Sequence, residues 1–339
     1  MSLFDPQPKK EPYDLYGREK ELTALVDDLK NKRWVVLLGP RRVGKTSLAQ
    51  CAAKELDMKT VFIDARSNPD LLNGLMKELS SRPSPSVRVG VGVAPFSGSV
   101  AFSRPAQLQS LDDTLKKSRE HLLVIVDEAE RLRNPRGVSS LLAHLYDYFY
   151  DDVTFLITGS AVGVMNSIIT PTSKSPLFGR AIVHTELKKW ADYTTSLNFL
   201  IKGCTQAHVK FEERDLSRAV ERLDGLPGWL TFFGFHYQRD RSYERAMKST
   251  VASAVKIISD ELEETAKLAN GWERQKKILQ LMSLEPMTFT EIKNAMKISS
   301  TALSGNLDML MRLQYIERDI EGRYGVADPL VKEYLRRGI

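Results

Sequence analysis

A glycine-rich segment early in the chain has the residue types and the spacing of a phosphate-binding loop. In the run WVVLLGPRRVGKTSLAQ, the pattern G-x-x-x-x-G-K-[ST] falls on Gly39, Gly44, Lys45 and Thr46. Glycine lets the backbone approach phosphate without a Cβ in the way, and the N–H groups of the loop and of the next helix can face phosphate oxygens. Lys45 is predicted to reach the β- and γ-phosphates, and the Thr46 hydroxyl to ligate Mg²⁺. The predicted nucleotide contacts are Gly39, Pro40, Arg41, Arg42, Val43, Gly44, Lys45, Thr46 and Ser47.

An apolar run that ends in two acidic residues supplies the second half of such a site. In HLLVIVDEAE, five apolar residues precede Asp127 and Glu128. An apolar strand buried on both faces is typical of a parallel sheet, which binds ligands at the carboxyl ends of its strands. Asp127 is predicted to hold Mg²⁺, directly or through water, and Glu128 to act as general base on the attacking water. A further strand, VTFLIT, ends where Thr158 or Ser160 can contact the γ-phosphate or that water.

Strand and helix patterns that alternate around these motifs predict the scaffold that positions them. Predicted strands cover residues 34–38, 60–64, 122–126, 153–158 and 181–187, and predicted helices open at residue 17 and cover 45–55, 68–80, 107–119 and 141–150. The alternation indicates a doubly wound α/β domain with a parallel sheet over residues 14–188. Residues 81–105 alternate valine and glycine between Pro/Ser clusters, which is consistent with either a hairpin or a mobile loop.

The remaining residues divide into three segments with other patterns. Residues 1–13 are polar and contain proline, which indicates a tail or arm. Residues 189–270 carry helical patterns that are interrupted by the sequence GLPG at 225–228, and they predict a helical domain. In 271–339, predicted helices cover 274–284, 288–296 and 299–313, a hairpin follows, and a last helix begins at 328. Three helices and a hairpin predict a winged helix-turn-helix domain.

Composition narrows the class of protein further. The chain has 339 residues, of which 42% are hydrophobic and 27% charged, so a packed core is expected. No apolar run approaches the ~20 residues of a membrane span, and the first residues lack the apolar region of a signal peptide, so we expect a cytoplasmic protein with no membrane partner. Two cysteines, Cys51 and Cys204, make neither a disulfide framework nor a metal cluster. The net charge of +6 favours a polyanionic partner only weakly.

Taken together, these motifs resemble the archaeal ATPase family, which is related to the AAA+ proteins, the STAND NTPases and the origin-recognition ATPases. The resemblance covers nearly the whole chain and rests on the motifs LYGREKEL, GPRRVGKT, IVDEAERL, ITGSA, PLFGRA and GLPGWL. It implies an AAA+/STAND-like P-loop NTPase sheet, followed by a helical lid domain and a C-terminal winged helix. It also implies that Gly17 and Arg18 frame the adenine side of the pocket and that Pro227 is the lid proline that responds to nucleotide.

The same resemblance assigns three residues near the γ-phosphate. Ser160, or Thr158, occupies the sensor-1 position, and Arg180 matches an arginine that senses phosphate or acts as a finger before the fifth strand. The alternative interpretations of these residues are a hydrogen bond at a strand end and a surface cation. We prefer action of Arg180 within its own chain over action on a neighbour, because nothing in the sequence indicates an oligomer interface.

The sequence thus predicts a slow ATPase that binds ATP with Mg²⁺ and releases ADP. Catalysis would combine positioning with charge stabilisation by Lys45, Mg²⁺ and Arg180, while Glu128 activates water. We expect a nucleotide-dependent switch that acts on an unidentified protein partner, with the oligomeric state open. The alternative is a DNA-binding regulator or replication-type factor. Residues 271–339 contain eleven Lys and Arg against nine Asp and Glu, and the candidate recognition helix 299–313 offers Asp308 and Arg312 as its charges, which is a weak DNA footprint.

Overall fold

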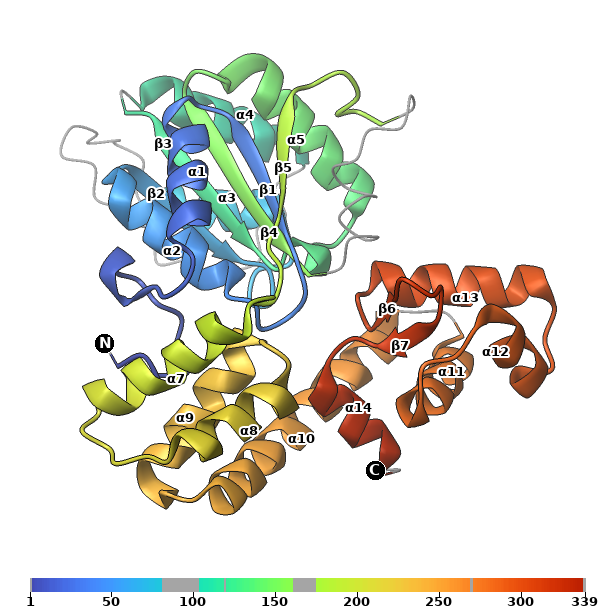
Figure 1. The fold of residues 1–339 in the computed structure, drawn as a ribbon. Coiled ribbons are helices and arrows are strands. Elements are labelled where there is room, and N and C mark those ends of the chain that lie inside the picture. Colours follow the sequence, from blue (N-terminus) through green and yellow to red (C-terminus); the bar gives the residue numbers. More distant parts are fainter. Residues whose placement is uncertain (1, 81–103, 119, 161–174, 269–270, 338–339) are drawn as a thin grey trace, which may run out of the picture.

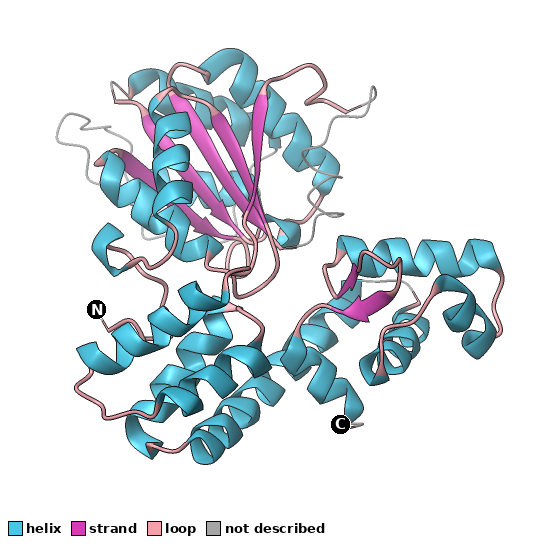
Figure 2. Ribbon diagram, in the orientation of Figure 1, coloured by secondary structure: helices cyan, strands magenta, loops and turns pink. Residues whose placement is uncertain are grey.

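The computed structural model describes residues 2–80, 104–118, 120–160, 175–268 and 271–337. The predicted excursion at 81–105 therefore lies outside the described residues, except at 104–105, where a helix begins. A parallel sheet with helices on both faces comes first, a helical segment follows, and helices with a small antiparallel sheet complete the chain (Figure 1). Figure 2 shows that the strands gather in the first of these regions, apart from one short pair in the last. The predicted α/β fold with a parallel sheet is confirmed.

The strands bring their carboxyl ends to one edge of the sheet. They are β1 (Trp34–Leu38), β2 (Lys59–Asp64), β3 (Leu122–Asp127), β4 (Val153–Gly159) and β5 (Ile182–Glu186). Their order is β2-β3-β4-β1-β5, and every neighbouring pair is parallel. Leu38 is level with Gly159 on β4 and with Glu186 on β5. Because the sheet is parallel, the loops after β1, β3 and β4 all leave from this edge, as the sequence predicted.

Helices cover both faces of the sheet, so its inner strands β1, β3 and β4 are buried on each side. Alternate residues of β3 enter two separate cores: Leu123 and Ile125 on one side, Val124 and Val126 on the other. The first face is covered by α1 (Glu19–Lys30) and α2 (Lys45–Leu56), and the second by α3 (Leu71–Ser80), α4 (Arg104–Lys117) and α5 (Pro135–Phe149). This double burial explains why these strands read as continuous apolar runs.

The helical segment lies against the carboxyl edge of the sheet (Figure 1). It contains α7 (Tyr193–Gln206), α8 (Glu213–Leu223), α9 (Pro227–Asp240) and α10 (Tyr243–Leu268). The connection from β5 is fixed by the Trp190 N–H, which donates to the Gly225 carbonyl at 2.9 Å in the turn between α8 and α9. Aromatic side chains of α9, including Trp229 and Phe233, are fully buried in the core that this segment shares with α1 and α2. The domain limits at 188 and 270 stay predictions.

The last segment packs on α10 through its final helix. It contains α11 (Trp272–Leu284), α12 (Phe289–Met296), α13 (Ser300–Arg312), the strands β6 (Ile316–Arg318) and β7 (Tyr324–Val326), and α14 (Pro329–Arg336). Side-chain caps fix three helix starts: Thr288 with Glu291 in a capping box, Ser299, and Asp328. Antiparallel β6 and β7 form the expected hairpin. No helix in the described part of the chain has both the length and the apolar character that crossing a membrane requires.

The N-terminal residues are packed against the helical segment, which corrects the interpretation of 1–13 as a tail or arm. Leu3 is 6% exposed and Phe4 is fully buried. The Leu3 N–H donates to the Gln206 side chain at 2.8 Å, and the Phe4 ring meets Phe199 edge to face. A short 3-10 helix, η1 (Pro12–Asp14), then leads to α1. The composition of this segment is polar, but Leu3 and Phe4 are anchored in the core.

The turn between α8 and α9 predicts a specific loss of stability. Gly225 has φ +66°, and a Cβ there would lie 2.1 Å from the Trp190 carbonyl oxygen, whereas Gly271 has a similar φ of +79° with nothing within 4 Å. A left-handed alanine costs about 1–2 kcal/mol at either position. We expect Gly225→Ala to lose a further ~1–3 kcal/mol from the overlap and to melt at a lower temperature than Gly271→Ala. Equal melting temperatures by circular dichroism would contradict this account of the turn.

Candidate nucleotide-binding site

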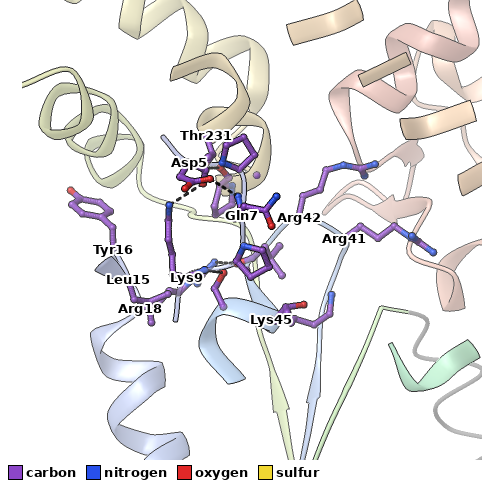
Figure 3. Close-up of a pocket in the computed structure, with 18 of the residues that line it drawn as sticks. Asp5, Gln7, Lys9, Leu15, Tyr16, Arg18, Arg41, Arg42, Lys45 and Thr231 are labelled. Atoms are coloured by element: carbon purple, nitrogen blue, oxygen red, sulfur yellow. Dashed lines mark hydrogen bonds between the residues drawn. The ribbon is translucent and has the colours of Figure 1, made fainter. Parts of the chain in front are cut away.

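A cavity of about 310 Å³ lies at the carboxyl edge of the sheet, between the sheet and the helical segment. Figure 3 shows side chains from the P-loop, the start of α1, the N-terminal segment and α9 around it. Most residues predicted from sequence line it together: Arg18, Arg41, Arg42, Val43, Gly44, Lys45, Thr46, Ser47, Asp127, Glu128, Ser160 and Pro227. The structure therefore assembles one site from motifs that are far apart in the sequence.

The loop between β1 and α2 holds Lys45 at the start of the helix. Its ammonium donates to the carbonyl oxygens of Gly39 and Pro40, each at 2.7 Å, and the side chain is buried. Burial lowers the pKa of Lys45 to about 8, although the nearby Glu130 carboxylate opposes that shift. Gly44 caps α2 with φ +97°, a conformation that glycine adopts readily. Lys45 is thus held over the loop that the sequence predicts to bind phosphate.

The backbone of the same loop fits an anionic ligand. In the described part of the chain, the N–H groups of Val43 and Gly44 have no acceptor. The first N–H groups of α2 have no intrahelical partner either, as at any helix start. A Cβ at Gly44 would meet no described residue within 4 Å, which leaves space above the loop among these residues. Unpaired donors, open space and a helix N-terminus are the features that bind phosphate.

Hydroxyl groups position the predicted metal carboxylate. The Thr46 hydroxyl donates to the two oxygens of Asp127 at 2.9 and 3.2 Å, and the buried Thr158 hydroxyl donates to the same carboxylate. Among the described residues there is no cluster of three or more acidic, His or Cys side chains that could hold a metal alone. A single carboxylate beside a hydroxyl suits Mg²⁺, which usually keeps several waters and binds phosphate as well. The residues present therefore fit the predicted ion.

The predicted general base is held by two arginines. The Glu128 carboxylate accepts from the Nε of Arg131 at 2.7 Å and lies 3.5 Å from the Nε of Arg66. Its backbone is left-handed with φ +52°, and its N–H donates to the Thr158 hydroxyl at 3.3 Å. Burial raises the pKa of Glu128, while the positive charge of Arg66 acts in the opposite direction. A raised pKa suits a general base, but in this arrangement the carboxylate is engaged by guanidinium groups.

A third carboxylate near the site was not singled out from the sequence. Glu130 is 8% exposed, and its Oε1 accepts from the backbone N–H of Ser160 at 3.1 Å and from the Ser160 hydroxyl. Its Oε2 is buried without a partner in the described residues. Ser160 thus lines the cavity, as predicted, with its hydroxyl bound to a carboxylate. The signal in the sequence was the second glutamate of DEAE, two positions after Glu128.

Of the two residues predicted to frame the adenine side, Arg18 lines the cavity and Gly17 does not. The Arg18 guanidinium is buried and donates to the carbonyl oxygens of Val43 at 3.2 Å and Lys188 at 2.5 Å. Its role in this structure is to hold α1 against the P-loop and the chain after β5. Gly17 is not among the residues that line the cavity, and its carbonyl accepts from the Trp190 indole at 3.3 Å. The structure gives Gly17 a packing role in place of the predicted nucleotide contact.

Arg180 lies away from the cavity, which corrects our preference for a role within its own chain. It precedes β5, whose first residue, Ile182, is level with Trp34 at the beginning of β1. The residue before a parallel strand is at the edge of the sheet opposite the P-loop. The guanidinium binds the Asp147 carboxylate, with Nε to Oδ1 at 2.9 Å, and the Pro176 carbonyl. A role on the nucleotide of a neighbouring subunit stays a prediction.

Comparison with known proteins agrees with this geometry. The family described as "ATPase domain predominantly from Archaea" matches residues 15–233. No curated protein sequence matches the chain. Among solved structures, the Walker-type ATPase of Pyrococcus abyssi is similar with 30% identity and a TM-score of 0.79, over 98% of this chain and 99% of that one.

Two further structures share the fold at lower identity. The Aeropyrum pernix ORC2 protein, solved as ADPNP–ADP complexes, has 17% identity and a TM-score of 0.69, over 99% of this chain and 96% of that one. Cdc6p from Pyrobaculum aerophilum has 15% identity and a TM-score of 0.54, over 99% and 98%. At these identities the likeness concerns the fold alone.

The position of Lys45 predicts a binding defect that a neighbouring lysine should not share. Lys45→Ala removes the buried ammonium beside the unpaired N–H groups, and a charge-assisted hydrogen bond contributes about 1.5–3 kcal/mol. We expect ATP affinity, measured by calorimetry, to fall by about 10- to 150-fold without loss of folding. Lys54→Ala, on an exposed turn of the same helix, is the control and should bind normally. An unchanged affinity in a folded Lys45→Ala protein would refute the phosphate assignment.

Proposed function

Since this chain belongs to the family of ATPase domains found predominantly in Archaea, we propose that it binds ATP with Mg²⁺ and hydrolyses it slowly to ADP and phosphate. We further propose that the bound nucleotide sets how residues 189–339 dock on the P-loop. In this proposal residues 189–270 are a lid and residues 271–339 a winged helix. The output is a conformational switch that a protein partner reads.

The contacts of Arg42 are the observation that carries the switch. Arg42 belongs to the P-loop, yet its Nη2 lies 2.6 Å from the Glu261 carboxylate on α10 and its Nη1 3.2 Å from Asp328 at the start of α14. Its guanidinium carbon also lies 4.1 Å from the centre of the Trp229 ring on α9. One side chain of the phosphate-binding loop therefore contacts both the helical segment and the last segment.

Backbone contacts tie the same loop residue to the start of α9. The Gly228 N–H donates to the Arg42 carbonyl at 2.8 Å, and a Cβ at Gly228 would lie 2.7 Å from the Arg42 Cβ. Pro227, the predicted lid proline, is the first residue of α9 and lines the cavity. A phosphate that moves the loop therefore acts on α9 directly, which supports the coupling of nucleotide to lid position.

A second chain of contacts connects the predicted base to the lid. Arg131 binds Glu128 through Nε and reaches Glu264 on α10 through Nη2 at 2.5 Å. While α10 is docked, Arg131 keeps the Glu128 carboxylate occupied. Movement of α10 would remove Glu264, one of the two carboxylates that hold Arg131 in place, and so let Arg131 and the Glu128 carboxylate shift together. This arrangement supports hydrolysis that depends on lid position, and it accounts for slow turnover.

In the proposed catalysis the protein supplies position and charge. The P-loop N–H groups and Lys45 hold the phosphates, and Thr46 with Asp127 holds Mg²⁺, which neutralises phosphate charge when bound. Ser160 senses the γ-phosphate side, and Glu128 orients the attacking water. Arg180 can contribute only from an adjacent subunit in this conformation, so its role requires assembly.

In the part of the chain that the structure describes, no particular contact or charge supports DNA binding, the alternative function. The helix α13 carries Asp308 and Arg312 as its charged residues. Recognition of base edges usually uses several Arg, Lys, Asn or Gln side chains. The switch proposal therefore rests on observed contacts, and the DNA proposal on fold resemblance.

Replacing the predicted base separates ATP binding from hydrolysis. Glu128→Gln keeps the size of the side chain but removes its basicity, and general bases contribute about 10²–10⁴-fold. We expect phosphate release to fall at least ~100-fold while ATP affinity is retained. Glu120 is an exposed glutamate just before the first residue of β3, at the opposite end of the strand from Glu128. Glu120→Gln is therefore the matched control and should hydrolyse ATP at the normal rate. Near-normal turnover of Glu128→Gln would place the base elsewhere.

The switch itself predicts a change in distance between the sheet domain and the last segment. Spin labels at Lys54→Cys on α2 and Met311→Cys on α13 occupy exposed positions, while the native cysteines are buried. We expect different distance distributions with ADP and with ATP, the latter held by Glu128→Gln. Identical distributions in both states would refute a nucleotide-dependent rearrangement.

An aspartate that caps a helix offers a selective test of the docking contact. Asp328→Asn keeps an N-cap side chain but removes the charge that faces Arg42. We expect the labelled protein then to populate the undocked distance without nucleotide. Asp192→Asn, which changes the N-cap of α7, is the control and should keep the docked distance. Failure of Asp328→Asn to alter the distribution would show that Arg42 does not govern docking.

A further inference from the structure

The N-terminal segment closes the cavity, and we infer that residues 2–9, here called the strap, hold and read the base of the bound nucleotide. Within the strap, Gln7 selects adenine over guanine. The inference rests on the proposed ATP site and adds a source of base specificity that the P-loop motifs do not contain. Five strap residues that line the cavity besides Gln7 are Leu3, Asp5, Pro6, Pro8 and Lys9.

One end of the strap is locked into the helical segment by Phe4. A Cβ added at Gly203 on α7 or at Gly234 on α9 would lie 2.2 Å from the Phe4 ring. Two glycines on adjacent helices thus form a notch that the ring fills, and Phe4 has no exposed surface. Leu3 adds the hydrogen bond to Gln206 at the end of α7. This end of the strap is therefore held by the helical segment.

The other end of the strap is fixed to the P-loop helix by Lys9. The Lys9 N–H donates to the Ser47 hydroxyl at 3.0 Å, and its carbonyl accepts from the Cys51 thiol at 3.6 Å. The Lys9 ammonium turns back to the carbonyl oxygens of Ser2 and Asp5, at 2.7 and 2.9 Å, which closes the strap on itself. Residues 5–8 consequently bridge from the helical segment to α2.

The strap and the P-loop line the same cavity, so the strap can contact the base of a nucleotide whose phosphates lie at the P-loop. Figure 3 shows Lys45 on one side of the cavity and Asp5, Gln7 and Lys9 on another. Ser47, to which the strap is attached, follows the residues predicted to hold the phosphates and Mg²⁺ along α2. Lys45 and the strap line the same cavity, so a nucleotide with its phosphates at Lys45 can extend across it to the strap.

Gln7 has the free polar groups that base recognition needs. It is exposed, it lines the cavity, and no partner of its side-chain amide occurs among the described residues. The backbone N–H of Gln7 donates to Asp5 Oδ1 at 2.9 Å, and Pro6 and Pro8 have no N–H. The backbone N–H groups of residues 6–8 are therefore not available to the base. A primary amide offers an NH2 donor beside a carbonyl acceptor, which match the N7 acceptor and the N6 amino donor of adenine, whereas guanine presents two acceptors at N7 and O6.

Equilibrium binding of ATP and GTP to Gln7 variants tests the inference. We expect the wild-type protein to prefer ATP and Gln7→Ala to lose that preference by about tenfold or more. Gln7→Glu removes the donor to N7 and keeps an acceptor for the N6 amino group, so it should weaken ATP binding without improving GTP binding. Gln109→Ala, an exposed position on α4, is the control and should keep the wild-type ratio. Because Gln7 is exposed, these variants should fold.

The outcomes distinguish the strap inference from the proposed ATP site. An unchanged ATP-to-GTP ratio in Gln7→Ala, or equal binding of both by the wild type, would overturn base reading by the strap and leave the ATP site intact. Absence of nucleotide binding by the wild type would overturn the proposed function itself. Phe4→Ala gives a second measurement: release of the strap should speed ATP dissociation, measured by stopped flow, about tenfold. An unchanged dissociation rate in a folded Phe4→Ala protein would refute the anchoring.

Discussion

A largely buried guanidinium on the phosphate-binding loop constrains how the other elements can pack. The Arg42 side chain is 12% exposed and is compensated by Glu261 and Asp328, which come from two different helices. Removing one partner of a buried ion pair leaves an uncompensated charge, at a cost of about 3–5 kcal/mol. The loop conformation and the docking of α10 and α14 therefore depend on one another. In the proposed switch, phosphate is a competing anion at this loop and would shift docking to the extent that its affinity differs between the two states.

The sheet and half of the site could be predicted because each is indicated by a pattern within one short stretch of sequence. An apolar run such as 122–126 indicates a strand buried on both faces of the sheet. A glycine pattern followed by Lys45 and Thr46 indicates a phosphate-binding loop before a helix. The placement of Arg180 could also have been deduced. In a parallel sheet a residue before a strand lies at the opposite edge from a residue after one, and the sequence already indicated parallel strands. The family resemblance indicates where Arg180 lies along the chain, but the direction of β5 determines at which edge of the sheet it lies.

The strap and the docking contacts could not be read from the sequence for a different reason. Phe4 is one aromatic residue in a polar segment, and its burial depends on glycines about two hundred residues away, at 203 and 234. Glycine in a helix usually indicates weak helix propensity, so the notch has no signature of its own. The partners of Arg42 are equally distant, at 261 and 328. Long-range pairs of this kind depend on the packing of whole segments, which periodicity does not encode.

Two adjacent carboxylates at the end of β3 are separated in role by their surroundings. Asp127 accepts from the hydroxyls of Thr46 and Thr158, groups that stabilise a carboxylate without neutralising its charge, so it remains able to bind a cation. Glu128 is held by guanidinium groups, of which Arg131 is itself bound to α10. In the proposed mechanism, the position of Glu128 thus depends on a helix outside the sheet. We propose that hydrolysis is slow while this helix is docked, so that a nucleotide state persists long enough for a partner to read it.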